Sequence, residues 1–302
     1  MEPNSTLFVQ IASYRDPELI NTIDDALNKA KNPDLLTFGI CWQHDGKENL
    51  DKYRNDPRFK IIDIHYSHSK GACWARHLAQ KLYTGEKYTL QLDSHHRFIK
   101  DWDIILIGML EKLKPKSRKP VLTTYVAPYE VGKTISESPP CKMVAKPTND
   151  IGFNFSPEYI GDYRNLKEPI AARFVSAHFL FTYGYYCMEC VYDPHLYFSG
   201  EEHTLAVRLY TYGYDLYHPH INVVYHEYTR NYRTKHWDDH TDAKKDAWYL
   251  LDQGSKIRVR QLLGIENNNI DLGIYGLGKE RSLDDYQKYA KLNFKTGLIE
   301  QF

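Results

Sequence analysis

The alternation of strand-like and helix-like segments in the first third of the chain most constrains its fold. Short apolar runs that suit strands occur at residues 7–12, 36–42, 59–65 and 88–92. Between them, apolar residues recur every three or four positions over 20–30 and 71–83, as they do on the buried face of a helix. The short links between these segments predict an α/β fold in which a mostly parallel central sheet is flanked by helices.

Local signals mark the ends of the expected helices. Asp16 can cap the first helix with Pro17 at its first position, and Asn32-Pro33 stops its apolar pattern. A later helix is expected to begin near Glu201 and to end at Gly213, a glycine that suits a helix stop. These boundaries place the intervening loops at the ends of strands.

The chain after residue 127 is less regular. Residues 128–169 are crowded with turn-forming residues, which predicts either a lid or acceptor loop, or a plain surface excursion. Residues 172–191 are aromatic and rich in strand-forming residues. We expect one domain over residues 1–245, with a C-terminal extension over 246–302 packed on the same domain.

The overall charge argues against a partner bound by bulk electrostatics. The 302-residue chain carries 39 basic and 39 acidic side chains, so its formal net charge is zero. Duplex nucleic acid and anionic membrane surfaces are therefore not expected as partners. No apolar run approaches the roughly 18 residues of a membrane span, and the first ten residues lack the layout of a signal peptide. Five scattered cysteines, an odd number, favour a reduced cytoplasmic setting.

Familiar cofactor motifs are missing from the sequence. Neither G-x-x-x-x-G-K-[ST] nor G-x-G-x-x-G occurs, which weighs against ATP and NAD. Cys187 and Cys190 form a C-x-x-C on what reads as a tyrosine-rich strand, but a structural zinc needs a second pair that the chain lacks. The 25 tyrosines suit the binding of sugars or peptides, although most also fit a simple role in strands.

The sequence Asp93-Ser94-His95-His96 directly follows the strand expected at 88–92. In an extended backbone Asp93 and His95 point to the same side, so a carboxylate oxygen and an imidazole nitrogen can meet at one divalent cation. Such mixed ligands suit manganese or magnesium, with positions left for water or phosphate oxygens. The alternative is a surface turn in which Asp93 caps the backbone. His96 points the other way and is expected to be structural.

Other candidates belong to the same crevice. Ligands bind beyond the carboxyl ends of parallel strands, where both the loop at 13–17 and the 93–96 loop are expected to lie. His226 follows a strand expected over 221–225 and can supply a third metal ligand. Arg76 can reach a nucleotide or its diphosphate, because a guanidinium suits phosphate geometry, or it is a solvated charge on a helix.

Two neighbouring carboxylates open the helix that begins near Glu201. Glu201 and Glu202 would both benefit from the dipole of the helix, which is a purely structural role. The functional alternative is that one of them faces the acceptor. Adjacent residues on a helix diverge by about 100°, so we expect only one of the two to face the cleft.

Five segments together resemble a known family. They are IASYRD at 11–16, GACWAR at 71–76, LQLDSHHRF at 90–98, YDPHLYFSGEEHTLAVRLYTYGYDLYHP at 192–219 and YGLGKERSLDDY at 275–286. In this order they resemble the protein-hydroxyproline (polypeptide) N-acetylglucosaminyltransferases. The pairing of a helical A-R with D-S-H at a strand end is also similar to the polypeptide N-acetylgalactosaminyltransferases. The resemblance covers nearly the whole chain.

The resemblance implies a GT-A fold, UDP-GlcNAc as donor, a divalent metal that is usually manganese, and retention of anomeric configuration. It implies metal ligands at Asp93, His95 and His226 and a catalytic acidic pair at Glu201 and Glu202. The donor-binding residues that it implies are Ala12, Ser13, Tyr14, Arg15, Arg76, Asp93 and Ser94.

The acceptor stays open at this point. Residues 128–169 have no counterpart in the family pattern, so the sequence does not identify the acceptor. We expect a hydroxyproline, Ser or Thr hydroxyl of a polypeptide, and the alternative acceptor is a glycan. A transferase for another UDP-hexose is a second alternative. A metal-dependent hydrolase and a non-catalytic sugar- or peptide-binding module are the remaining ones, and the intact D-S-H and G-E-E argue against the last.

Overall fold

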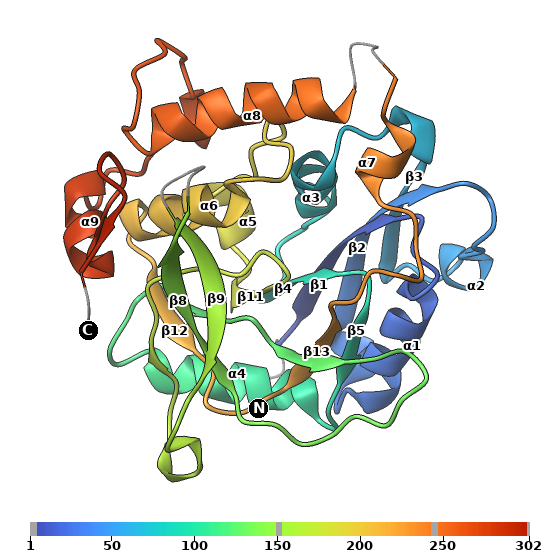
Figure 1. The fold of residues 1–302 in the computed structure, drawn as a ribbon. Helices are drawn as coiled ribbons and strands as arrows, with labels where there is room; N and C mark the ends of the chain where they lie inside the picture. Colours follow the sequence, from blue (N-terminus) through green and yellow to red (C-terminus); the bar gives the residue numbers. More distant parts are fainter. Residues whose placement is uncertain (1–4, 149–152, 243–246, 301–302) are drawn as a thin grey trace.

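An eight-stranded sheet forms the centre of the computed structural model, which describes residues 5–148, 153–242 and 247–300 (Figure 1). Its strand order is β10-β12-β6-β11-β4-β1-β2-β3. The bounds are β1 Leu7–Tyr14, β2 Leu36–His44, β3 Phe59–His65, β4 Tyr88–Asp93, β6 Pro120–Thr123, β10 Ile170–Ala171, β11 Phe179–Tyr183 and β12 Asp215–His218. The strands β3, β2, β1 and β4 run parallel, whereas β11 is antiparallel to both β4 and β6. The predicted α/β fold with a mostly parallel sheet is therefore confirmed.

The helices cover both faces of this sheet. They are α1 Leu19–Lys29, α2 Asp51–Arg54, α3 Ala72–Gln80, α4 Trp102–Leu113, α5 Tyr186–Glu189, α6 Glu201–Thr211, α7 His236–Asp239, α8 Trp248–Leu262 and α9 Leu283–Ala290. Because side chains alternate along a strand, Leu7, Val9 and Ile11 of β1 pack with α1 and α4, whereas Phe8 packs in the cluster that contains α6. None of the helices in the described ranges is both long enough and apolar enough to cross a bilayer.

Asp16 does not cap α1 as its position predicted. The residues between Asp16 and α1 form a turn, and the helix begins at Leu19 with Glu18 as its N-cap residue. One oxygen of Asp16 accepts the backbone N–H of Glu18 at 3.0 Å, while the other turns toward the loop after β4. The carboxylate of Asp16 therefore contacts both the turn before α1 and the loop after β4, and the N-cap position belongs to Glu18.

His226 lies on the central strand of a small second sheet. Its order is β5-β13-β7, with bounds His96–Phe98, Val224–Glu227 and Ala127–Tyr129. His226 pairs with His96 across the antiparallel β13–β5 ladder. The strand expected at 221–225 was placed too early, because β13 begins only at Val224. His226 therefore lies within the strand and does not follow it.

The turn-rich stretch at 128–169 contains regular structure that its composition did not predict. An antiparallel hairpin is formed by β8, Cys141–Pro147, and β9, Phe153–Tyr159. Buried Met143 and Phe153 anchor it in the core cluster that also contains α6. Residues 149–152 of this stretch lie outside the described residues.

One further expectation, the placement of the C-x-x-C on a strand, needs correction. The aromatic stretch at 172–191 holds β11 but then turns into α5, so the C-x-x-C lies on a short helix and not on a strand. All five cysteines are buried and free.

The C-terminal helices α8 and α9 pack against α6 through a shared apolar cluster that includes Leu205, Val259 and Tyr286. After α9 the chain forms a two-stranded sheet of β14, Leu292–Asn293, and β15, Leu298–Ile299. The expected boundary between residues 245 and 246 lies outside the described residues, so the division into a domain and an extension stays a prediction.

Candidate active site

The loop that follows β4 is held in place by α1. Thr22 donates a hydrogen bond to the carbonyl of Ser94 at 2.8 Å and accepts the N–H of His96 at 2.9 Å. His95 and His96 are buried as a result. The loop is therefore part of the interior edge of the sheet, and the alternative of an exposed surface turn is wrong.

Asp93, His95 and His226 converge as the sequence predicted. One candidate ligand atom from each lies within 4.8 Å of the others. Asp93 Oδ2 is 3.2 Å from His226 Nε2 and 3.8 Å from His95 Nε2. His95 Nε2 is buried and has no hydrogen-bond partner in the described part of the chain. A carboxylate and two imidazoles with such an orphaned nitrogen fit a divalent cation.

The protonation states of this cluster suit metal binding. Burial lowers the pKa of His226 well below its usual range, so the ring is neutral and keeps a lone pair. Burial alone would raise the pKa of Asp93, but the Arg76 guanidinium and His226 hold it well below its usual range. His96 is buried beside His226, with ring centroids 4.9 Å apart, and is outside the three-residue cluster.

Arg76 is a buried ionic link and not the solvated helix charge that was the alternative. Its guanidinium forms ion pairs with Asp93 and, at 2.9 Å, with Glu201. Only 6% of its surface is exposed. Arg76 therefore joins the metal candidate at the end of β4 to the first residue of α6.

Glu201 and Glu202 differ in their surroundings. Glu201 is buried and accepts a hydrogen bond from the hydroxyl of Tyr192. Glu202 is half-buried; its carboxylate accepts the N–H of Ala177 at 2.8 Å and the hydroxyl of Tyr125. Burial raises the pKa of both, and that of Glu202 to about 7.

Both carboxylates line one cavity, although only one of them was expected to face the cleft. The cavity lies at the helix start, and side chains in the first turn lean toward that end, so both reach it. The helix start itself is fixed by Gly200, whose φ of 83° is left-handed and where a Cβ would lie 2.6 Å from Val259 of α8.

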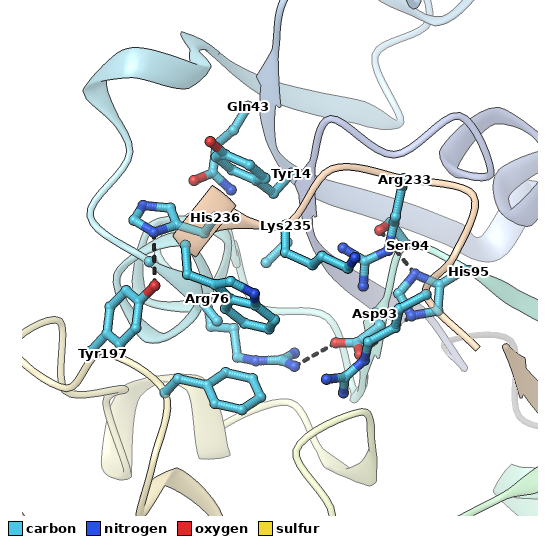
Figure 2. Close-up of a pocket in the computed structure, with 16 residues that line it drawn as sticks. Tyr14, Gln43, Arg76, Asp93, Ser94, His95, Tyr197, Arg233, Lys235 and His236 are labelled. Carbon is cyan, nitrogen blue, oxygen red and sulfur yellow. Dashed lines mark hydrogen bonds and ion pairs between the residues drawn. The ribbon is translucent and has the colours of Figure 1, made fainter. Parts of the chain in front are cut away.

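The first of two adjoining cavities lies at the carboxyl ends of β1 and β4, and for the role that we propose for it we call it the donor cavity. Figure 2 shows Tyr14 and Gln43 toward one end of it and Asp93 and His95 toward the other. It is lined by Ala12, Tyr14, Gln43, Gly71, Ala72, Arg76, Asp93, Ser94, His95, Tyr197, Phe198, Arg230, Arg233, Lys235, His236 and Trp237.

Two of the predicted donor-binding residues do not line the donor cavity. Ser13 is fully buried. Arg15 is engaged by Asp45 at 2.8 Å and by Asp239 at 2.6 Å. Three cations that sequence reasoning missed do line it: Arg230, Arg233 and Lys235, all from the segment that follows β13. The cluster of basic residues in TRNYRTK, residues 229–235, was the available signal.

The second cavity opens beside the start of α6, and for the role that we propose for it we call it the acceptor cavity. It has a volume of about 420 Å³, which falls within the roughly 300–1,000 Å³ of ligand pockets. Its lining comprises Arg76, Asp93, Tyr125, Asn154, Phe155, Ala177, His178, Phe198, Ser199, Gly200, Glu201, Glu202, His203, His226, Tyr228 and Arg230. Asn154 and Phe155 come from β9, so the hairpin forms one wall. Four residues, Arg76, Asp93, Phe198 and Arg230, line both cavities.

Comparison with known proteins identifies both a family and a fold. The family model described as Glycosyltransferase (GlcNAc) matches residues 6–54 and 48–296. The structure is similar to GalNAc-T7 with UDP, GalNAc and Mn²⁺, with a TM-score of 0.61 and 14% identity over 98% of this chain and 56% of that chain. It is similar to residues 1–349 of S. aureus TarS in complex with UDP-GlcNAc, with a TM-score of 0.50 and 14% identity over 88% of this chain and 68% of that chain.

The chain thus spans little more than half the length of the GalNAc-T7 chain. None of the curated proteins matches it. At 14% identity the structural likeness is one of fold, and it confirms the expected GT-A fold.

Proposed function

The chain belongs to the Glycosyltransferase (GlcNAc) family, and from this premise we propose that it transfers GlcNAc from UDP-GlcNAc to a hydroxyl group of a polypeptide, with retention of configuration and with a divalent metal. The observation that carries the proposal is the Asp93–His95–His226 cluster at the junction of a cation-lined cavity and a carboxylate-lined cavity. A nucleotide diphosphate on one side and an acceptor on the other fit these charges.

The donor cavity is the proposed site of UDP. Arg230, Arg233 and Lys235 offer positive charge to the diphosphate, as guanidinium and ammonium groups do in phosphate sites. Tyr14 and Gln43, at the other end of the cavity, are the residues that we propose contact the nucleoside. The cavity has a volume of about 110 Å³, below the roughly 300 Å³ of small ligand pockets, so we propose that lining side chains shift when UDP binds.

Asp93, His95 and His226 would hold the Mn²⁺, or Mg²⁺ in its place. A divalent ion held there supplies Lewis-acid stabilisation of the charge that develops on the departing diphosphate. The chain prepares the site by keeping Asp93 ionised beside Arg76 and His226 neutral.

The acceptor cavity is the proposed site of the sugar and the attacking hydroxyl. During transfer, the bond from the anomeric carbon to the diphosphate oxygen breaks and its electron pair leaves with UDP. The acceptor oxygen forms the new bond on the same face of the sugar, and its proton passes to the departing phosphate oxygen. Glu202, which is half-exposed in this cavity, is the carboxylate proposed to face the sugar or acceptor, while Glu201 holds Arg76.

The choice of GlcNAc, of a polypeptide hydroxyl and of retention is supported by the sequence resemblance, and the structural relatives are solved with UDP, UDP-GlcNAc or GalNAc. A cytoplasmic location belongs to the same proposal, supported by five buried free thiols.

A panel of UDP-sugars with Mn²⁺ tests the proposal, with release of UDP as the readout. Each reaction is run with and without a hydroxyproline-containing peptide, and the product linkage is determined by mass spectrometry and NMR. We expect faster UDP release from UDP-GlcNAc than from UDP-glucose, a gain with peptide, and an α-linked product. Turnover of only a non-uridine donor, or donor hydrolysis that no hydroxyl acceptor diverts, would overturn it.

A further inference from the structure

Asp16 is a buried carboxylate whose place in the fold the helix-capping role does not explain. Only 2% of its surface is exposed. Its Oδ2 atom accepts a hydrogen bond from Ser94 Oγ at 2.6 Å and lies 2.6 Å from His95 Nδ1. Arg233 Nε is 3.5 Å from the same oxygen. A buried charge is costly unless it is paired, so these contacts are the reason that it is tolerated.

The contact with His95 determines which nitrogen of that ring carries the proton. A carboxylate beside Nδ1 favours the proton on Nδ1, and the lone pair then lies on Nε2. His95 Nε2 is the nitrogen directed at Asp93 Oδ2, 3.8 Å away, and it has no hydrogen-bond partner among residues 5–148, 153–242 and 247–300. The two ends of one ring therefore have separate tasks.

We propose that Asp16 is a positioning residue of the metal site: it holds His95 with the proton on Nδ1 and with Nε2 turned toward the cation. This inference rests on the proposed function, because it presumes that the cluster binds a divalent ion. Through Arg233, the same carboxylate also orients a guanidinium that lines the donor cavity.

The backbone of the loop does not depend on Asp16. Thr22 holds the carbonyl of Ser94 and the N–H of His96 independently of the carboxylate. Loss of the Asp16 charge should consequently disturb the ring and the guanidinium while the loop keeps its path. This separates a positioning role from a merely structural one.

The experiment is binding of Mn²⁺ alone, followed by the EPR signal of the free ion, in wild type, Asp16→Asn and Asp103→Asn. Asp103 is the matched control: it is a buried aspartate that accepts the backbone N–H groups of Lys31 and Asn32 at 2.7 and 2.9 Å, away from the cluster. We expect Asp16→Asn to weaken Mn²⁺ binding roughly 10- to 100-fold, as loss of such outer partners does. Asp103→Asn should lower the melting temperature at least as much and leave Mn²⁺ affinity unchanged.

Wild-type Mn²⁺ affinity in a folded Asp16→Asn protein would overturn the inference. If that variant does not fold, ¹⁵N NMR of the histidine rings in metal-free wild type decides: a proton on His95 Nδ1 supports it, and a proton on Nε2 overturns it. The two proposals fail separately. If Asp16→Asn binds Mn²⁺ more weakly but the wild type transfers no sugar, only the proposed function is wrong. If the wild type is an active transferase and Asp16→Asn binds Mn²⁺ with unchanged affinity, only the proposed role of Asp16 is wrong.

Discussion

The donor and acceptor cavities share Arg76, Asp93, Phe198 and Arg230, and they differ in charge beyond these four residues. Arg233 and Lys235, from the segment after β13, line only the donor cavity, whereas Glu201 and Glu202 line only the acceptor cavity. A leaving group that departs as an anion is favoured by the first environment, and a sugar carbon that gains positive character is favoured by the second. In the proposed reaction, separate electrostatic surroundings would therefore serve the departing diphosphate and the sugar.

The two cavities are also built differently. The donor cavity lies at the ends of the parallel strands β1 and β4, whose register places Ala12 opposite Asp93. The acceptor cavity is assembled from β9, β13 and the start of α6, which are far apart in the sequence. The effects of substituting residues that line only one cavity should therefore be separable from the effects of substituting residues that line only the other.

Substitution of the shared junction should have the largest effect. In Asp93→Ala the metal candidate loses its carboxylate, and UDP release from UDP-GlcNAc should fall at least roughly 10³-fold, about 4 kcal/mol of transition-state stabilisation. EDTA should abolish wild-type turnover and added Mn²⁺ should restore it. Asp63→Ala, which removes an exposed carboxylate outside both cavities, is the control and should turn over normally. Full activity in a folded Asp93→Ala protein would remove the metal site.

On the acceptor side alone, Glu202→Gln keeps the shape of the side chain and its contact with the N–H of Ala177. Transfer to the acceptor should fall about 10²-fold, or roughly 2.7 kcal/mol, while UDP affinity barely changes. Glu201→Gln should instead weaken the ion pair with Arg76 and lower the melting temperature more. Transfer rates and UDP binding for both variants test this. A near-normal rate in Glu202→Gln would take this residue off the catalytic list.

A smaller effect is expected on the donor side. Lys235→Ala should weaken UDP binding about tenfold, roughly 1.4 kcal/mol, because one charged contact to the diphosphate is lost. The backbone N–H of Lys235 still donates to Asp238 at 2.9 Å in the variant. Uridine affinity, measured by calorimetry, should hardly change, and exposed Lys47→Ala should alter neither. Equal losses for UDP and uridine would show that Lys235 does not meet the diphosphate.

The smallest effect concerns the pH dependence of stability. The folded-state pKa of Glu202, about 7, lies above its ordinary value of 4.5, so between these values the folded protein holds a proton that the unfolded chain has released. The free energy of unfolding contributed by this group therefore falls as pH rises from 4.5 to 7.

Glu202→Gln lacks this dependence, so its melting temperature relative to wild type should increase between pH 5 and pH 8. The expected increase is roughly 2–4 °C for each kcal/mol of unfolding free energy that the wild type loses over this range. Melting curves at several pH values measure the difference. Curves for the two proteins that run parallel across this range would show that Glu202 does not titrate near neutrality.

Sequence reasoning succeeded where the determinants are local. The four parallel strands and the helices α1 and α3 follow from periodicities within single segments, and the approach of Asp93 to His95 follows from a two-residue spacing. It failed where distant packing decides. The sequence of the β8–β9 hairpin resembles a loop because it is rich in polar residues and prolines. The hairpin is held by Met143 and Phe153, which pack in the core cluster, and the local sequence does not show that these two residues are buried.

The same limit explains the misassigned or overlooked site residues. Asp16 precedes a helix and fits a cap locally, but its partners Ser94 and His95 lie 78 and 79 residues away. Arg230 and Lys235 sit in a basic run that a solvated loop would also show, and only the fold places them in a cavity.

Because Arg76 and Asp93 line both cavities, a ligand in either cavity would lie against the same two charged side chains, and we expect its binding to change the electrostatic field in the other cavity. Linkage then requires reciprocity: whatever factor bound UDP applies to acceptor affinity, bound acceptor applies to UDP affinity. Under the proposed function, UDP and the acceptor would therefore not bind independently, and this aspartate and this arginine would be the residues that couple their affinities.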